Sequence, residues 1–293
     1  MNNKNYIIYI ISVAGFFLLC LFSCIDRIDI STEASPPRLV VYGYITTDTT
    51  QHAIRITRSS GFFETTKPEG ISNASVSISC DDEVFELKES SEEPGLYLTS
   101  PDVYGISGKT YTLHASLDFN GDGQQEDYEA KSYLPFSVTL DSVAVTVSPF
   151  SDEFLQVLIW GSLPEESSNY FSFHLLRNGI VLNDSLRGFR FVSDDYVVSN
   201  RFAALPAFML NTERERYKLS SGDTVAVQVG SITAEYAIFM QNAQREMYGP
   251  IPLFGGPPAN IGTNIRCLSS DSKTGISGFF TAYSKHSAYT IYE

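Results

Sequence analysis

Cationic side chains are scarce in this sequence. Its 293 residues include 20 lysines and arginines against 34 aspartates and glutamates, which gives a net charge of −14 at pH 7. A surface of this sign repels phosphate backbones and anionic headgroups. Nucleic acid is therefore a poor candidate partner, and we expect none.

Recognisable catalytic motifs are also missing. The sequence contains no G-x-S-x-G, H-E-x-x-H, C-x-x-C or G-x-G-x-x-G pattern. The four histidines lie far apart, mostly beside polar residues in strand-like segments, and we interpret them as sheet-surface residues: His52, His114, His174 and His286. We expect a non-catalytic protein, with a hydrolase that assembles a convergent site as a lesser alternative.

One long apolar run is present, at the beginning of the chain. Lys4 precedes the run Tyr6 to Phe22, and Leu21-Phe22-Ser23-Cys24 follows the pattern of a bacterial lipobox. The alternative is a retained membrane anchor, but the run is short for a span and no basic cluster follows it. We predict a signal peptide over 1–23 and a Cys24 that carries palmitate-type acyl chains.

The rest of the chain reads as a tether followed by two domains. Residues 24–37 are short, polar and end in two prolines, as a flexible tether does. Residues 38–135 hold seven short strand signals with regular turns: LVVYGYIT, HAIRITRS, ASVSISC, EVFELKE, GLYLTS, KTYTLHASL and DYEAKSYLP. This spacing predicts an immunoglobulin-like or transthyretin-like β-sandwich.

Residues 136–293 predict a second β-rich domain. Asn178-Gly179 is a strong hairpin signal because both residues tolerate positive φ. The segment 233–247 places apolar residues at helical spacing, and we expect this helix to pack on the second sheet. Two strands, ISGFFTAYS and SAYTIYE, are expected to end the chain.

A twelve-residue acidic segment between two of the predicted strands matches the pattern of a calcium-binding loop. Calcium prefers six to eight hard oxygen ligands, and glycine at the sixth position permits the sharp turn. An acidic hairpin without metal is the open alternative, since Asp-Gly and Asn-Gly are also ordinary hairpin residues. The possible Ca²⁺ ligands are Asp118, Asn120, Asp122, Gln124, Glu126 and Glu129.

Two kinds of modification remain open. Cys20 leaves with the signal peptide and Cys24 is lipidated, so Cys80 and Cys267 are left, and the sequence does not determine whether they pair. Asp-Ser or Asp-Thr followed by an aliphatic residue or threonine resembles the bacteroidete O-glycosylation site. The matches are Thr49, Ser142, Ser185 and Thr224.

The order of these features resembles one family. The lipobox, LVVYGYIT, ISNASVSI, LDSV after a proline, and GGPPANIGTNI followed by SGFFTAYS are similar to the domain-of-unknown-function family 4249. The resemblance implies a bacteroidete outer-membrane lipoprotein, on the periplasmic or cell-surface face, encoded beside TonB-dependent receptors. We therefore expect a ligand-binding or accessory component of TonB-dependent nutrient uptake, with a structural or adhesive surface module as the alternative.

Overall fold

Most residues that the structure describes lie in β-strands. The computed structural model describes residues 36–61, 67–164, 170–194, 199–248, 261–269 and 274–293. Along the chain the elements are β1 Leu39–Thr46, β2 Ala53–Arg58, β3 Ser75–Cys80, β4 Glu83–Glu89, β5 Leu96–Leu98, β6 Thr110–Leu117, β7 Glu126–Tyr133, β8 Thr139–Ser148, β9 Ser151–Ser162, β10 Tyr170–Arg177, β11 Ile180–Val181, η1 Leu186–Gly188, β12 Arg190–Ser193, β13 Arg201–Asn211, η3 Glu215–Tyr217, β14 Thr224–Ile232, α2 Ala234–Tyr248, β15 Ile265–Cys267 and β16 Ile276–Ile291. The predicted mainly-β class with a packed helix is confirmed.

The N-terminal half is a sandwich whose two layers are hydrogen-bonded through β4. All seven strands predicted before residue 135 are present as β1 to β7. One layer has the order β1-β2-β5-β4 and the other β3-β6-β7-β15, and β4 pairs with both β5 and β3. The predicted sandwich is confirmed, with β15 added to it from the C-terminal part of the chain.

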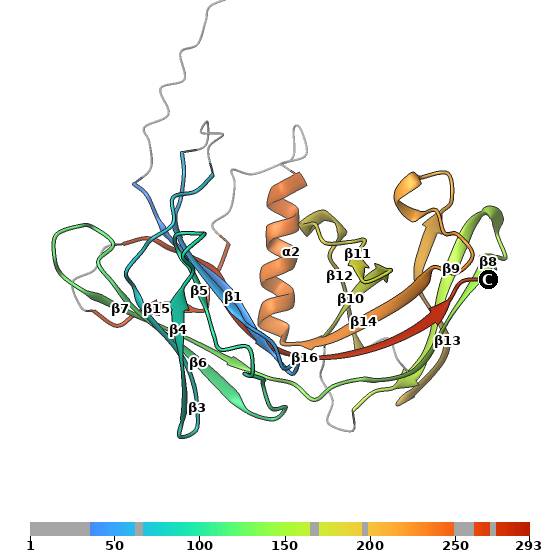
Figure 1. Cartoon of the computed structure of the whole chain (residues 1–293), viewed down its shortest axis with the longest axis horizontal. Coiled ribbons are helices and arrows are strands. Elements are labelled where there is room, and N and C mark those ends of the chain that lie inside the picture. The colour runs from blue at the N-terminus through green and yellow to red at the C-terminus, as the bar shows by residue number, and fades with distance from the viewer. Residues whose placement is uncertain (1–35, 62–66, 165–169, 195–198, 249–260, 270–273) are drawn as a thin grey trace, which may run out of the picture. The chain divides into compact units, whose positions relative to one another are not determined.

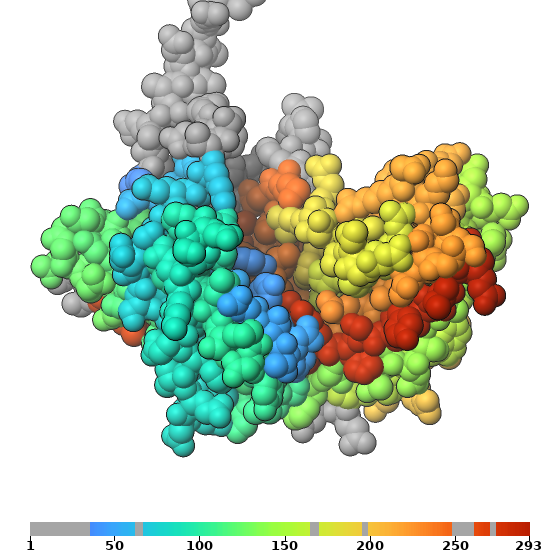
Figure 2. Space-filling model, viewed as in Figure 1, coloured from blue at the N-terminus to red at the C-terminus, as the bar shows by residue number. Residues whose placement is uncertain are grey.

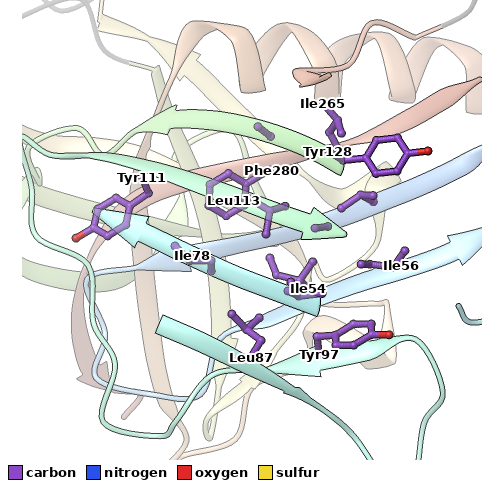
Figure 3. Packing of buried hydrophobic residues seen from close by; sticks show 14 of the residues in the cluster. Ile54, Ile56, Ile78, Leu87, Tyr97, Tyr111, Leu113, Tyr128, Ile265 and Phe280 are labelled. Carbon is purple, nitrogen blue, oxygen red and sulfur yellow. The ribbon is translucent and has the colours of Figure 1, made fainter. Parts of the chain in front are cut away.

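The sandwich core follows from the period-two pattern of its strands. Ile54 and Ile56 of one layer and Ile78 and Leu113 of the other are almost completely buried between the layers (Figure 3). Tyr97 is also buried, and its hydroxyl donates a hydrogen bond of 2.8 Å to the carbonyl of Ile71. Its polar atom is therefore satisfied at the edge of an apolar core.

The C-terminal strand β16 joins the two halves of the fold. Its first half pairs parallel with β1, from Leu39↔Ile276 to Thr46↔Tyr283, and its second half pairs antiparallel with β14 (Figures 1 and 2). The expectation of two separate strands was wrong here: the strand keeps its direction through Lys285 and only its partners change. Residues Pro36–Glu293 form one compact unit, and the proposed boundary at 135 stays a prediction.

The second half has its own apolar core. Strands β13-β9-β8 form a three-stranded antiparallel sheet, and β14, β10 and β11 continue the long sheet beyond β16. The cluster between them includes Val157, Phe171, Leu175 and Val227. At the predicted hairpin, Asn178 and Gly179 have φ of 51° and 80°, which confirms the turn.

The α-helix packs on the long sheet, as the sequence predicted. Tyr236, Ala237 and Met240 are buried against Ile232 of β14 and Phe279 of β16. Among the described residues, no helix has the length and apolar character needed to cross a membrane. The predicted signal segment 1–23 and Cys24 lie outside the described residues.

Candidate functional site

A cavity of about 600 Å³ lies where α2 crosses the long sheet. Its floor is built from four adjacent strands, β10, β14, β16 and β1, and its sides from α2 and the segment around η1. Figure 2 shows the corresponding recess between the blue atoms of β1 and the yellow atoms around η1, with orange atoms of α2 at its back. The volume falls in the range of small-molecule sites.

Alternation along the strands places the floor side chains. Tyr42 and Tyr44 are two residues apart on β1, so both project from the face opposite the sandwich core. Tyr283 and Lys285 have the same spacing on β16, where Tyr283 lies at the end of the β1 pairing. These side chains of the adjacent strands β1 and β16 thus form one continuous polar and aromatic surface.

Four tyrosines dominate this surface. The hydroxyls of Tyr42 and Tyr236 are hydrogen-bonded at 3.0 Å, which links β1 to α2. The rings of Tyr44 and Tyr283 are tilted against each other with centroids 5.6 Å apart. Burial raises the pKa of Tyr42, and it raises the pKa values of Tyr236 and Tyr283 well above the ordinary tyrosine value. All three hydroxyls are therefore neutral at pH 7.

The charged groups around the cavity are compensated. Lys285 Nζ is 2.9 Å from Asp48 Oδ2, and its side chain is only 17% exposed. Asp184, on the opposite side, accepts a 2.8 Å hydrogen bond from Arg216. Burial, and then the charge of Lys285, lower the pKa of His174, so this imidazole is neutral at pH 7. The cavity thus presents little net charge to a ligand.

Gly230 of β14 shapes the floor. A Cβ at this position would lie 2.7 Å from Ser172 Oγ and 3.1 Å from Tyr283 Cδ2. The missing side chain therefore lets the Tyr283 ring lie against β14. Gly230 aligns with Ser172 on one side and with Lys285 on the other in the sheet register, and both of these neighbours line the cavity.

A serine, a histidine and an aspartate, the residue types of a serine hydrolase, line this cavity, but they form no hydrogen bonds with one another. Ser172, His174 and Asp184 all line it. Ser172 Oγ donates to the carbonyl of Gly230 at 3.3 Å, while His174 packs edge-on against Phe189 with centroids 5.9 Å apart. Nucleophilic catalysis needs a serine and a base within hydrogen-bond reach. The contacts of Ser172 and His174 direct these groups away from each other, and catalysis by them stays a lesser hypothesis.

A second cavity of about 610 Å³ lies between the three-stranded sheet and β10–β12. Its lining is largely apolar and includes Phe171, Phe173, Phe202 and Leu205. Phe189 separates this cavity from the tyrosine-lined one, because it lines both. The protein therefore has two neighbouring cavities of similar size and contrasting chemistry.

The family of the chain follows from its sequence. A family model described as Domain of unknown function (DUF4249) matches residues 25–288. The chain belongs to this family. No curated protein matches the sequence.

Solved structures show a weak likeness to this DUF4249 chain. The FN1–FN3 domains of chicken CNTN1 are 16% identical with a TM-score of 0.25, covering 68% of this chain and 64% of that one. β-Glucuronidase 3 of Bacteroides uniformis is 15% identical with a TM-score of 0.21, covering 67% and 23%. The adhesin InvE of Yersinia pseudotuberculosis is 10% identical with a TM-score of 0.19, covering 67% and 55%. The chain spans less than two thirds of the length of each.

The acidic segment of the DUF4249 chain forms a turn held by its own backbone. The Asp118 carboxylate accepts hydrogen bonds from the backbone N–H groups of Gly121, Asp122 and Gly123 at 2.7 to 3.2 Å. These bonds lower the pKa of Asp118, the largest contribution coming from Gly123. Asp122 in turn accepts from the N–H of Gln124, while Asn120 is exposed.

The two glutamates of the predicted calcium loop point away from it. Glu126 is buried on β7 and accepts a 2.8 Å hydrogen bond from the Tyr128 hydroxyl. Glu129, an odd number of residues further, faces the other side and lies 3.2 Å from Lys131 Nζ. No cluster of three or more acidic, histidine or cysteine side chains suits a metal ion in the described part of the chain. This geometry does not fit the twelve-residue ligand pattern, and calcium binding stays a prediction for titration.

The remaining sequence-predicted residues are dispersed. Thr49, Ser142 and Ser185 are exposed and Thr224 is partly buried at the start of β14. His114 is exposed and His174 and His286 are partly buried, but the surface interpretation was wrong for His52, which is fully buried. His52 Nε2 lies 3.2 Å from the carbonyl of Val103, and burial lowers its pKa.

Cys80 and Cys267, the cysteines of the described residues, are both free. Cys267 aligns with Tyr128 on β7, which aligns through β6 with Val76 of β3. Cys80 is four residues further along β3 and three strands away, a separation of about 13 Å along the strands and about 14 Å across them. A disulfide requires Cα atoms within about 7 Å, so the fold keeps these thiols apart.

Sequence reasoning missed the cavity residues. Tyr42 and Tyr44 were visible as alternating aromatics on the face of β1 away from the core, and Tyr236 was read only as a packing residue. The i, i+2 spacing of tyrosines in a strand was the available signal. Their convergence with Tyr283, more than 230 residues later, depends on the parallel β1–β16 pairing.

Proposed function

We propose that this protein is a lipid-anchored component of the bacterial outer membrane that binds a small ligand without catalysing its conversion. In this role it would act as an accessory protein of a TonB-dependent nutrient-uptake system. The observation that carries the proposal is the tyrosine-lined cavity of about 600 Å³, with compensated charges and no engaged serine-histidine pair. Such a cavity is suited to binding.

The lipid anchor follows from the sequence. Cys24 stands at the end of the lipobox, and fourteen residues at most separate it from the first described strand. Thioether-linked and amide-linked acyl chains each add about 0.8 kcal/mol of membrane affinity per buried methylene. A folded unit on this tether would remain at the membrane surface near an integral receptor.

The rival function is an adhesive module that accepts a strand from another protein. Such pairing needs a long, accessible sheet edge. The long sheet ends in β11 and β15, which have two and three residues. The three-stranded sheet has β13 and β8 at its edges. Register irregularities interrupt the ladder of both strands, and β13 also contains Pro206. These edges disfavour strand addition and support the ligand-binding proposal.

Native isolation from the source envelope tests the proposal. The acylated protein is expected to co-purify with a β-barrel receptor and to carry a small-molecule adduct in native mass spectrometry. Ala243→Phe, which places a ring in the cavity from α2, should remove the adduct. Met247→Phe is the matched control, because Met247 is 42% exposed on the same helix.

Two outcomes would contradict the proposal. An adduct that survives Ala243→Phe would place the ligand elsewhere. A Cys24→Ala variant that still incorporates labelled palmitate, or a wild-type chain that keeps Met1 and stays in the cytosol, would remove the anchor.

A further inference from the structure

The cavity between α2 and the long sheet contains polar groups that the protein itself leaves without partners. Within the described residues, no hydrogen bond is made by the hydroxyls of Tyr44 and Tyr283 or by the ring nitrogens of His174. These groups come from three different strands, β1, β16 and β10. Water in an open cavity satisfies such groups, and a ligand that supplies equivalent hydrogen bonds can displace that water, so this floor is suited to a ligand with hydroxyl groups.

Nearby polar groups of the same cavity are already used. Asn183 accepts from the N–H of Leu175 and donates to the carbonyls of Phe173 and Gly188. It therefore holds the cavity wall in place and offers little to a ligand. The contrast identifies the tyrosine and histidine groups of the floor as the available ones.

The charge distribution selects against ions. Lys285, the one cationic side chain among the described residues that line the cavity, is paired with Asp48. The acidic Asp184 is paired with Arg216. An anionic ligand would lack an unpaired cation, and a cationic ligand would lack an unpaired carboxylate. Either ion would lose its hydration without gaining an opposite charge, and an uncharged ligand avoids this cost.

The lining also combines ring faces with hydroxyls. Tyr283 lies against Gly230 and packs on Tyr44, while Phe239 and Met240 face the floor from α2. A pyranose ring has the complementary composition, because its C–H faces pack on aromatic rings and its hydroxyl edge both donates and accepts hydrogen bonds. A fatty acyl chain would leave the hydroxyls unpaired, and the neighbouring phenylalanine-lined cavity suits it better.

We propose that the cavity lined by Tyr44, His174 and Tyr283 binds an uncharged, polyhydroxylated ring, of the class of neutral mono- and disaccharides. The inference rests on the proposed ligand-binding function and names its ligand class. Tyr44 and Tyr283 hydrogen-bond the ligand hydroxyls, and their rings pack on its C–H face. His174 acts as a neutral donor or acceptor beside them.

The test uses the purified mature protein and three sets of probes in titration calorimetry. The first set is neutral gluco-, galacto- and manno-disaccharides, the second is the disaccharides of the corresponding uronic acids, and the third is palmitate. We expect binding of at least one neutral disaccharide, with the matching uronic acid at least tenfold weaker. Palmitate should not displace the bound sugar.

Hydroxyl-deletion variants locate the binding. Tyr44→Phe and Tyr283→Phe keep the rings, and each should weaken sugar binding about two- to tenfold through one lost hydrogen bond. Tyr289→Phe is the matched control, since Tyr289 is 70% exposed on the same strand as Tyr283, and should leave affinity unchanged.

Three results would overturn the ligand class: no neutral disaccharide binds, the uronic acids bind more tightly, or both hydroxyl deletions behave like the control. The proposed function is judged separately by the native isolation. An adduct that Ala243→Phe removes, together with failure of the sugars, would refute the sugar and retain the ligand-binding function. If the wild-type protein carries no adduct and binds none of the sugars, both the ligand-binding function and the sugar class are refuted.

Discussion

The parallel pairing of β1 with β16 depends on a glycine, and its substitution gives the sharpest stability prediction. Gly278 faces Val41 in this ladder and has φ of 99°. A Cβ there would lie 1.9 Å from the Val41 carbonyl oxygen and 2.7 Å from its carbonyl carbon. Both atoms belong to backbone in the centre of a sheet, so side-chain rotation cannot relieve the contact.

The cost of Gly278→Ala has two parts. A non-glycine residue held at this φ costs about 1–3 kcal/mol. Moving β1 away from β16 loses one or two backbone hydrogen bonds at about 0.5–1.5 kcal/mol each. The expected loss in the free energy of unfolding is therefore about 1.5–6 kcal/mol, a large part of the ~5–15 kcal/mol typical of a folded protein.

Urea unfolding of the purified mature protein measures this loss. Far-UV circular dichroism reports both halves, and fluorescence of Trp160, the single tryptophan, reports β9 in the second half. Because β16 is shared, we expect both signals to shift to lower urea, by about 1 M for 3 kcal/mol at a slope near 3 kcal/mol/M. Gly262→Ala is the control, since no atom lies within 4 Å of its added Cβ. A Gly278→Ala midpoint equal to that of the control would refute the reasoning.

Three further predictions concern His52, Asp118 and calcium. Burial lowers the pKa of His52, so as the pH falls the unfolded state protonates this residue before the folded state does. The contribution of His52 to the free energy of unfolding is therefore complete above about pH 6.5 and is lost as the pH falls below that value. Melting temperatures between pH 8 and 5 should fall less in His52→Gln than in wild type, and parallel curves would contradict this. Asp118→Ala should speed hydrogen exchange at the amides of Gly121 and Gly123, with Asp127→Ala as the control, because Asp118 accepts both N–H groups. Equal exchange in both variants would contradict the capping role. Calorimetry with millimolar calcium tests the metal hypothesis, which absence of heat and of thermal stabilisation would refute.

Local sequence pattern was enough to predict those elements whose conformation is decided by neighbouring residues. The strands β1 to β7, the Asn178-Gly179 turn and the helix α2 were all predicted, since strand alternation, positive φ and helical spacing are local properties. The Cys24 anchor is also a local motif, and it stays a prediction because the described residues begin after it.

Long-range pairing decided the rest. The composition and periodicity of the sequence determined a mainly-β chain with a packed helix, seven strands of a sandwich, and an acidic surface. Only the tertiary structure decided that β16 is one strand shared by both halves, that His52 is buried, and that Tyr44 meets Tyr283 in a cavity. The physical reason is that a strand carries the same period-two pattern whichever strand it pairs with, so its partner is chosen by the packing of the whole sheet.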